Sequence, residues 1–141
     1  MNAQDDAAQW RAGRREAAAA HADALRRKQE AESAQARELI AAFVRDAAVH
    51  GPAPEPLRAY TYDGRSRLRT PLRGWYLRLD ESIGIDTDGR FYLLRAPRSI
   101  GGLLRGVTPA ASDPPLVLGA GGKDGESIDL ADALARLVAA R

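Results

Sequence analysis

Residues 39–52, Leu-Ile-Ala-Ala-Phe-Val-Arg-Asp-Ala-Ala-Val-His-Gly-Pro, decide the fold because they join an apolar helical stripe to an abrupt helix stop. The spacing i, i+1, i+4, i+5, i+8 places large and small apolar side chains on one wide helix face. These side chains are Leu39, Ile40, Phe43, Val44 and Ala47. Gly51 can adopt a left-handed turn and Pro52 cannot continue a helix, so the helix is predicted to end at His50.

Upstream of this stretch the composition favours one long helix. Residues 3–50 contain 17 alanines, one glycine and no proline, and alanine has the lowest cost of entering a helix. Unbroken, such a helix is about 70 Å long. Between Trp10 and Leu39 the only large apolar residue is Leu25. This stretch therefore lacks the repeated apolar seam of a stable coiled coil, and an alanine-rich helix without packing is marginal in water.

Two interpretations of residues 1–35 follow. In one, they form a solvated and partly disordered extension. In the other, they dock on a protein partner or on a second copy of the chain, with Trp10 and Leu25 as anchors. Small side chains would let a partner helix approach closely, and they are Ala17, Ala18, Ala24 and Ala31.

Downstream, residues 51–56 form a proline-rich linker. Beyond it, apolar residues recur at every second position, as in a strand, and no longer with the spacing of a helix. Strands are predicted at residues 57–62, 72–79, 83–86 and 90–95, with less regular ones at 103–107 and 116–118. The short connections favour an antiparallel meander. Leu130, Leu134, Leu137 and Val138 then predict a final helix, which Ser127 or Asp129 can cap. The expected fold is α+β: a long N-terminal α-helix (1–50) followed by a small antiparallel β-meander covered by a C-terminal helix (57–141).

A basic and aromatic surface is the second candidate site. Arginines alternate along residues 65–69, and in the neighbouring strands Trp75, Leu77, Leu79, Phe91 and Leu93 are expected to face the core. The outward set would then be Arg65, Arg67, Arg69, Tyr76, Arg78, Arg90 and Tyr92. Such a face can neutralise phosphates and stack on unpaired bases, so RNA is the alternative partner. The same pattern also suits the ordinary polar side of a one-sided sheet.

Motifs for chemistry are weak. Gly121, Gly122 and Lys123 precede the final helix as in a phosphate cradle, but Asp124 stands where a Walker loop needs Ser or Thr. Asp124, Glu126 and Asp129 lack the spacing of an EF-hand, and Asp86 and Asp88 suit a turn. His21 and His50 both fall on the long helix, away from any expected pocket. We therefore expect a binding protein without cofactor or metal, and regard a small hydrolase or phosphate binder as the least favoured function.

Composition adds three limits. The chain has no cysteine, which excludes disulfides and thiolate chemistry. Arginines are concentrated at residues 58–105, which carry ten of them against five acids, although the formal net charge of the whole chain is only +2. The first residues are acidic and no apolar run of about 18 residues exists. These features predict a soluble, cytoplasmic protein with no membrane partner.

Overall fold

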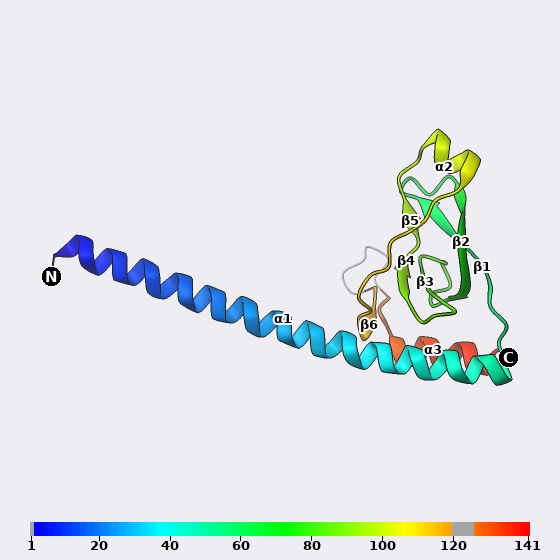
Figure 1. Cartoon of the computed structure of the whole chain (residues 1–141), viewed down its shortest axis with the longest axis horizontal. Helices are drawn as coiled ribbons and strands as arrows, with labels where there is room; N and C mark the ends of the chain where they lie inside the picture. The colour runs from blue at the N-terminus through cyan, green and yellow to red at the C-terminus, as the bar shows by residue number, and fades with distance from the viewer. Residues whose placement is uncertain (1, 120–125) are drawn as a thin grey trace.

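The computed structural model describes residues 2–119 and 126–141, and it has the expected α+β organisation. Helix α1 (Ala3–His50) runs along the whole length of the molecule, and all the other elements gather at its C-terminal end (Figure 1). The Asn2 side chain accepts a hydrogen bond of 2.9 Å from the backbone N–H of Asp5 and caps the start of α1. Gly51, with φ of 77°, closes its end by donating to the carbonyl of Ala47. The predicted helix boundary is confirmed.

The apolar stripe of α1 packs on the globular part. Ala36, Ile40, Phe43 and Ala47 are buried, while Leu39 and Val44 pack at the edge of the same cluster. The Phe43 and Trp75 rings meet edge to face with centroids 5.1 Å apart. In addition, the Trp75 indole N–H donates to the carbonyl of Pro52 at 2.9 Å. One side chain therefore joins the helix, the linker and the sheet.

The sheet has the spatial order β4-β3-β2-β1-β5. Its strands are β1 (Glu55–Thr61), β2 (Arg67–Tyr76), β3 (Ile83–Asp86), β4 (Phe91–Leu93) and β5 (Arg95–Ala96). The first four form the predicted antiparallel meander, and β5 pairs parallel to β1. Leu94, between β4 and β5, donates to the carbonyl of Ser82 and accepts from the backbone N–H of Tyr60. The two ends of the sheet thus meet at this residue, and the sheet closes into a small barrel.

Closure of the barrel corrects the expected orientation of Tyr92 and Leu93. Tyr92 was expected to point outward, but it is buried inside the barrel; Leu93, expected inward, is 54% exposed. The reason is that both faces of this part of the sheet are buried. Phe91 contributes to the core against the helices, whereas Tyr92 belongs to the barrel interior with its neighbours in space. Those neighbours are Leu57, Ala59, Leu68, Leu94 and Ala96.

The Tyr92 hydroxyl has a buried partner. It donates to Oδ2 of Asp86 at 2.8 Å, and Oδ1 of the same carboxylate accepts from the backbone N–H groups of Asp88 and Arg90 at 2.9 Å each. Asp86 therefore organises the turn between β3 and β4, as its place beside Gly89 suggested. Burial, and then the hydrogen bond to Asp86, raise the pKa of Tyr92 above its ordinary value of 10.0.

The remaining elements include two further corrections. Residues 103–107 form no strand; helix α2 (Ile100–Arg105) lies there, capped by Ser99. Leu79, expected in the core, is 85% exposed because β2 ends at Tyr76. Strands β6 (Val117–Leu118) and β7 (Ile128–Asp129) pair, and α3 (Leu130–Ala139) packs against α1. Asp129 occupies the N-cap position of α3 without a capping side-chain hydrogen bond.

We expect Tyr92→Phe to lower the free energy of unfolding by about 2 kcal/mol, because it removes a buried hydrogen bond to a carboxylate. The stability that this hydroxyl provides is present below pH 10 and is lost as the pH rises through the raised pKa, so the variant should also lose less stability in alkali. Urea unfolding at pH 7 and at pH 10–11 measures both effects. Tyr62→Phe is the control, because Tyr62 is 67% exposed. Equal stability of the two variants would contradict the assignment.

Candidate interaction surfaces

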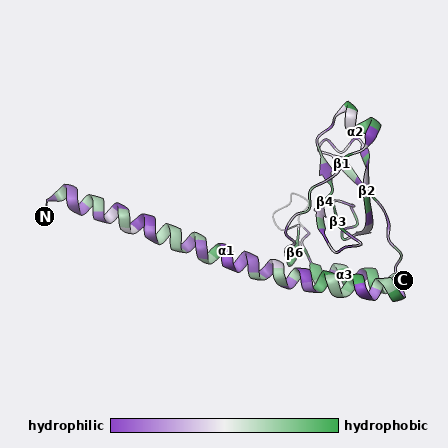
Figure 2. Ribbon diagram, in the orientation of Figure 1, coloured by the Kyte–Doolittle hydropathy of each residue, from purple (hydrophilic) through white to green (hydrophobic). Residues whose placement is uncertain are grey.

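The N-terminal half of α1 extends beyond the globular part (Figure 1). The Glu32 side chain is hydrogen-bonded to the globule, since its Oε1 accepts from the backbone N–H of Leu116 at 3.0 Å. Arg37 then pairs with Asp113. We call residues 3–31 the arm. Along the arm, apolar alanines alternate with charged residues, whereas the docked end of α1 is continuously apolar on one side (Figure 2).

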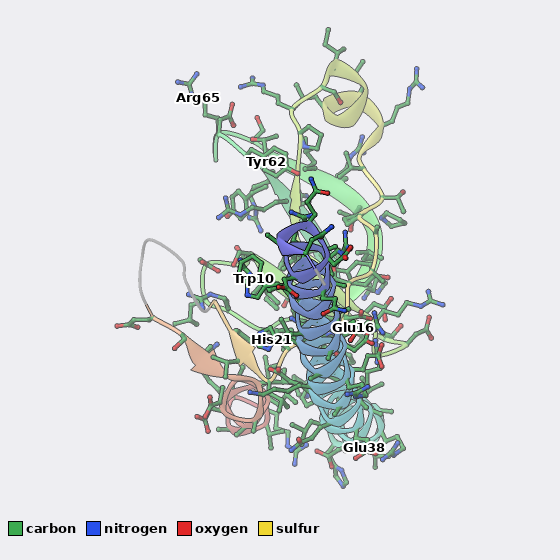
Figure 3. All side chains as sticks on the ribbon, turned by 90° about the vertical axis from the view of Figure 1, so that its left-hand side faces the viewer. Trp10, Glu16, His21, Glu38, Tyr62 and Arg65 are labelled. Carbon is green, nitrogen blue, oxygen red and sulfur yellow. The ribbon has the colours of Figure 1, made fainter. Side chains whose placement is uncertain are left out.

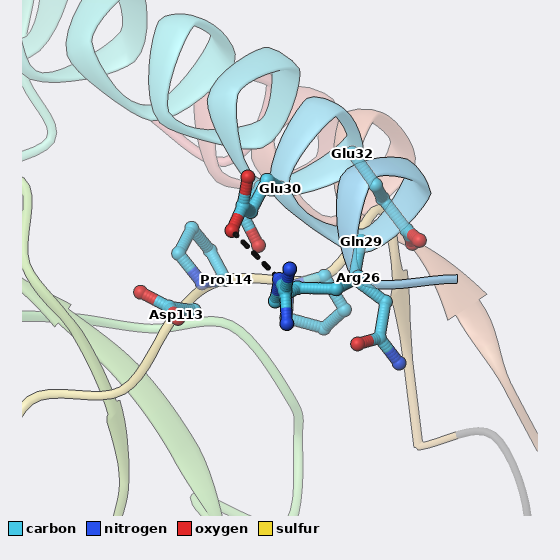
Figure 4. Close-up of a pocket in the computed structure, with 8 residues that line it drawn as sticks. Arg26, Gln29, Glu30, Glu32, Asp113 and Pro114 are labelled. Carbon is cyan, nitrogen blue, oxygen red and sulfur yellow. Dashed lines mark ion pairs between the residues drawn. The ribbon is translucent and has the colours of Figure 1, made fainter. Parts of the chain in front are cut away.

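At the base of the arm, α1 and residues 113–115 enclose a groove of about 490 Å³ (Figure 4). Arg26 lies in this groove, 4.0 Å from Glu30 and 2.7 Å from Asp23. These ion pairs lie on the helix surface and hold Arg26 along α1. The groove is polar on the helix side and lined by Pro114 and Pro115 on the other. It is an open cleft at the point where the arm joins the globule.

Trp10 and Leu25, the predicted anchors, are 62% and 49% exposed. Figure 3, viewed along α1 from its N-terminal side, shows Trp10 projecting sideways from the helix. The Arg14 guanidinium lies over its ring, 4.9 Å from the centroid. Such a cation–π contact covers one ring face and fixes the side chain, but it contributes only about 0.5–1 kcal/mol at an exposed site.

Helical geometry places Leu25 on the face of α1 that packs on the globular part near the C-terminal end of the helix. Separations of 7 and 11 residues correspond to about two and three turns. Ala7, Ala18, Leu25, Ala36 and Phe43 follow these separations, and Ala36 and Phe43 are buried in the core. The face that packs on the globule therefore continues into the arm, where small residues and Leu25 replace the large side chains.

The structure brings part of the predicted basic and aromatic set together, since the Arg67 side chain contacts Tyr76, whereas Tyr92 is buried elsewhere. Arg65, Arg67, Arg69 and Arg90 are exposed, but Arg67 pairs with Glu81 at 3.0 Å and Arg69 donates to the carbonyl of Leu104 at 2.8 Å. Arg78, 18% exposed, donates to the carbonyls of Leu118 and Glu126.

The positions of the predicted aromatic residues, Tyr76 and Tyr92, also differ from the expectation. The Tyr76 hydroxyl accepts from the backbone N–H of Arg58 at 2.9 Å, and Tyr92 is inside the barrel. Of the predicted basic set, Arg67 lies over an aromatic ring, 5.4 Å from the Tyr60 centroid. Tyr60 was missed because no pattern in the sequence paired its strand with the segment that carries Arg67, although Arg58 shares its parity. Only its pairing with Arg67 across β1 and β2 identifies it.

The candidate chemical motifs divide into two groups. Gly121, Gly122 and Lys123 lie outside the described residues. Within the described part of the chain, no three His, Cys, Asp or Glu side chains are grouped to hold a metal ion. His50 lies at the end of α1 with Nδ1 3.0 Å from Oδ1 of Asp46. The hydrogen bond from Arg141 to Asp46, 2.6 Å long, holds the pKa of that carboxyl below 3.8 and ties the end of the chain to α1.

Comparison with known proteins gives no match to a family model, a curated protein or a solved structure. The helices of the described segments include none with the length and apolarity needed to cross a bilayer.

Removing residues 2–25 should leave the globular part intact. We expect its free energy of unfolding to change by less than about 0.5 kcal/mol, because the deleted residues lie ahead of the groove and of the buried stripe. Urea unfolding followed by the fluorescence of buried Trp75 measures this. A loss of several kcal/mol would show that the arm packs on its own globule in solution.

Proposed function

We propose that the protein is a non-enzymatic binding module that uses the arm to dock a protein partner or a second copy of the chain. The observation that carries the proposal is the continuity of one helix face. That face is buried from Ala36 to Ala47 and continues exposed through Leu25 toward the N-terminus. A partner helix laid on the arm would extend the packing that α1 already makes.

The chemistry of the arm suits a partner helix. Ala17 and Ala18 keep the backbone surface narrow, so a second helix can approach closely along most of the arm. Trp10 and Leu25 then supply the two large side chains, about 22 Å apart along the helix axis. Large anchors surrounded by small neighbours are the arrangement in which a few residues contribute most of the binding free energy.

The uninterrupted helix gives the module a defined reach. From Trp10 to Arg26, where the groove begins, the rise of α1 amounts to about 24 Å. A partner bound at the arm is therefore held at a fixed distance and direction from the barrel. This is the property expected of an adaptor or spacer.

RNA has weaker support as the partner. The proposed stacking residue Tyr92 is buried, and Arg67 and Arg78 are engaged by Glu81 and by backbone carbonyls. If RNA were the ligand, the affinity would fall steeply with salt, and Arg67→Ala with Arg69→Ala would reduce the slope by about 0.7 for each phosphate contact removed.

We expect Trp10→Ala with Leu25→Ala to weaken association through the arm by about 30-fold or more, which corresponds to about 2 kcal/mol of lost anchor contact. Sedimentation equilibrium of the full chain measures self-association. Recovery of bound protein from a nuclease-treated lysate measures a different partner.

The matched control is Val49→Ala, because Val49 is 76% exposed at the other end of the same helix. Both variants should keep the unfolding midpoint of the parent chain. Association that survives the double substitution and shows a steep salt dependence would contradict docking through the arm and favour RNA.

A further inference from the structure

A second exposed apolar cluster lies at the end of the barrel away from α1. Helix α2 forms this end, beside the turn between β1 and β2 where Tyr62 and Arg65 lie (Figures 1 and 3). Contact between Arg98 and Asp63, 3.4 Å apart, joins the two segments. We call them together the tip. Its exposed large apolar side chains are Tyr62, Ile100, Leu103 and Leu104, which are 67%, 78%, 45% and 69% exposed.

Helix α2 has its apolar side turned to solvent. Gly102 is the residue that faces the barrel and is buried. A Cβ at this position would lie 3.0 Å from Oγ of Ser99 and 3.2 Å from Cγ1 of Val107. The inner side is thus tight even for a methyl group, and the large residues of α2 are exposed on its other side. Stability alone favours the opposite arrangement, with leucine inside.

The exposed side chains are held on a firmly anchored segment. Ser99 caps α2 by accepting from the N–H of Gly102 at 2.9 Å. On the other side, the Arg69 side chain donates to the carbonyl of Leu104, and the Arg69 carbonyl accepts from Val107 at 2.8 Å. Gly106, with φ of 83°, lets the backbone approach Arg69 closely. The cluster is therefore presented by a fixed turn.

The charge around the cluster is positive. Residues 89–112 contain four arginines and no acidic residue, and residues 64–79 contain five arginines and none. Arg65, Arg98 and Arg105 belong to the tip itself. The acid of the tip is Asp63, which accepts from the Thr61 hydroxyl at 2.6 Å and from the N–H of Arg65 at 2.9 Å and pairs with Arg98 at 3.4 Å.

This combination fits an anionic lipid surface better than a protein or RNA. The tip is the outermost end of the barrel (Figure 1), so its apolar side chains can enter a soft interface that needs no matching pocket. A stable protein interface buries about 800 Å² on each partner, which is much more than four side chains at one end provide. Leucine and isoleucine offer nothing to phosphate or base edges, whereas arginine beside them suits lipid headgroups.

We propose that the tip docks on anionic membrane surfaces by inserting Ile100, Leu103 and Leu104 between the headgroups while the surrounding arginines contact lipid phosphates. Insertion of a short apolar segment by about 5–10 Å needs no membrane-spanning helix. The sequence predicted no membrane partner because it has no long apolar run. That reasoning concerns membrane-spanning helices and does not apply to shallow insertion of the tip. With the tip inserted, α1 lies at the opposite end of the barrel and its arm remains accessible.

Co-sedimentation of the full chain with vesicles tests the proposal. We expect binding to vesicles of phosphatidylcholine with about one third phosphatidylserine, and at least tenfold weaker binding to phosphatidylcholine alone, because about fivefold in affinity is expected for each arginine near the surface. Ile100→Ser with Leu104→Ser should weaken binding to the anionic vesicles by about tenfold or more. Arg98→Gln with Arg105→Gln should weaken it by about 25-fold.

The control is Val49→Ser with Leu79→Ser, which changes two equally exposed apolar residues outside the tip and should leave vesicle binding unchanged. All variants should keep the parent unfolding midpoint within about a degree, because the apolar side chains lie in solvent and Arg98→Gln removes only an exposed ion pair, which contributes little to stability. Trp10→Ala with Leu25→Ala should also bind vesicles normally, so failure of the arm and failure of the tip are distinguishable.

Three results would overturn the proposal. The first is no binding to anionic vesicles, and the second is equal binding by the parent and the Ile100→Ser, Leu104→Ser variant. The third is self-association that the same substitutions abolish while vesicles are not bound, which would make the tip an interface between two copies.

Discussion

The contact between Phe43 and Trp75 is the constraint on which the rest of the structure depends. Trp75 is 5% exposed and touches α1 through Phe43 and the linker through Pro52. Burial of an aromatic side chain contributes about 1.5–3 kcal/mol, whereas the alanine-rich helix alone is marginal. The docked end of α1 therefore stabilises the helix, and it fixes the direction in which the arm leaves the globule.

That same contact explains why the sheet closes. Helices α1 and α3 cover one face through Trp75, Leu77 and Ile85, so the other face must find its own cover. The chain supplies it by curling β5 onto β1, which encloses Leu57, Leu68 and Leu94. Tyr92 points into this interior, and its buried hydroxyl is tolerated there because it donates a hydrogen bond to the Asp86 carboxylate.

The parts predicted correctly are those governed by local rules. Helix spacing, the glycine and proline stop and the two-residue strand period identified α1, the meander and α3. Barrel closure depends on the pairing of residues far apart in sequence, and no local pattern reports it, so the outward assignment of Tyr92 was wrong. Helix α2 was missed for another reason: Leu103 and Leu104 suggested a strand, while the Ser99 cap and the i, i+3, i+4 spacing of Ile100, Leu103 and Leu104 carried the helical signal. Of the two candidate surfaces, the arm could be predicted from helical periodicity. The tip could not, because only the tertiary structure brings its residues to one end of the barrel.

Exposed apolar residues differ in what they imply. Val49 and Leu79 stand alone on the surface, and single exposed side chains of this kind are ordinary. The arm and the tip are different, because this chain has few large apolar residues, 28 of its residues being alanine, and still leaves Trp10, Leu25, Ile100 and Leu104 in solvent. A small domain has little apolar area to spare for its own stability. Placing these side chains at two extremities, one on a helix face and one on an anchored turn, makes sense when each gains its burial from contact with something outside the monomer.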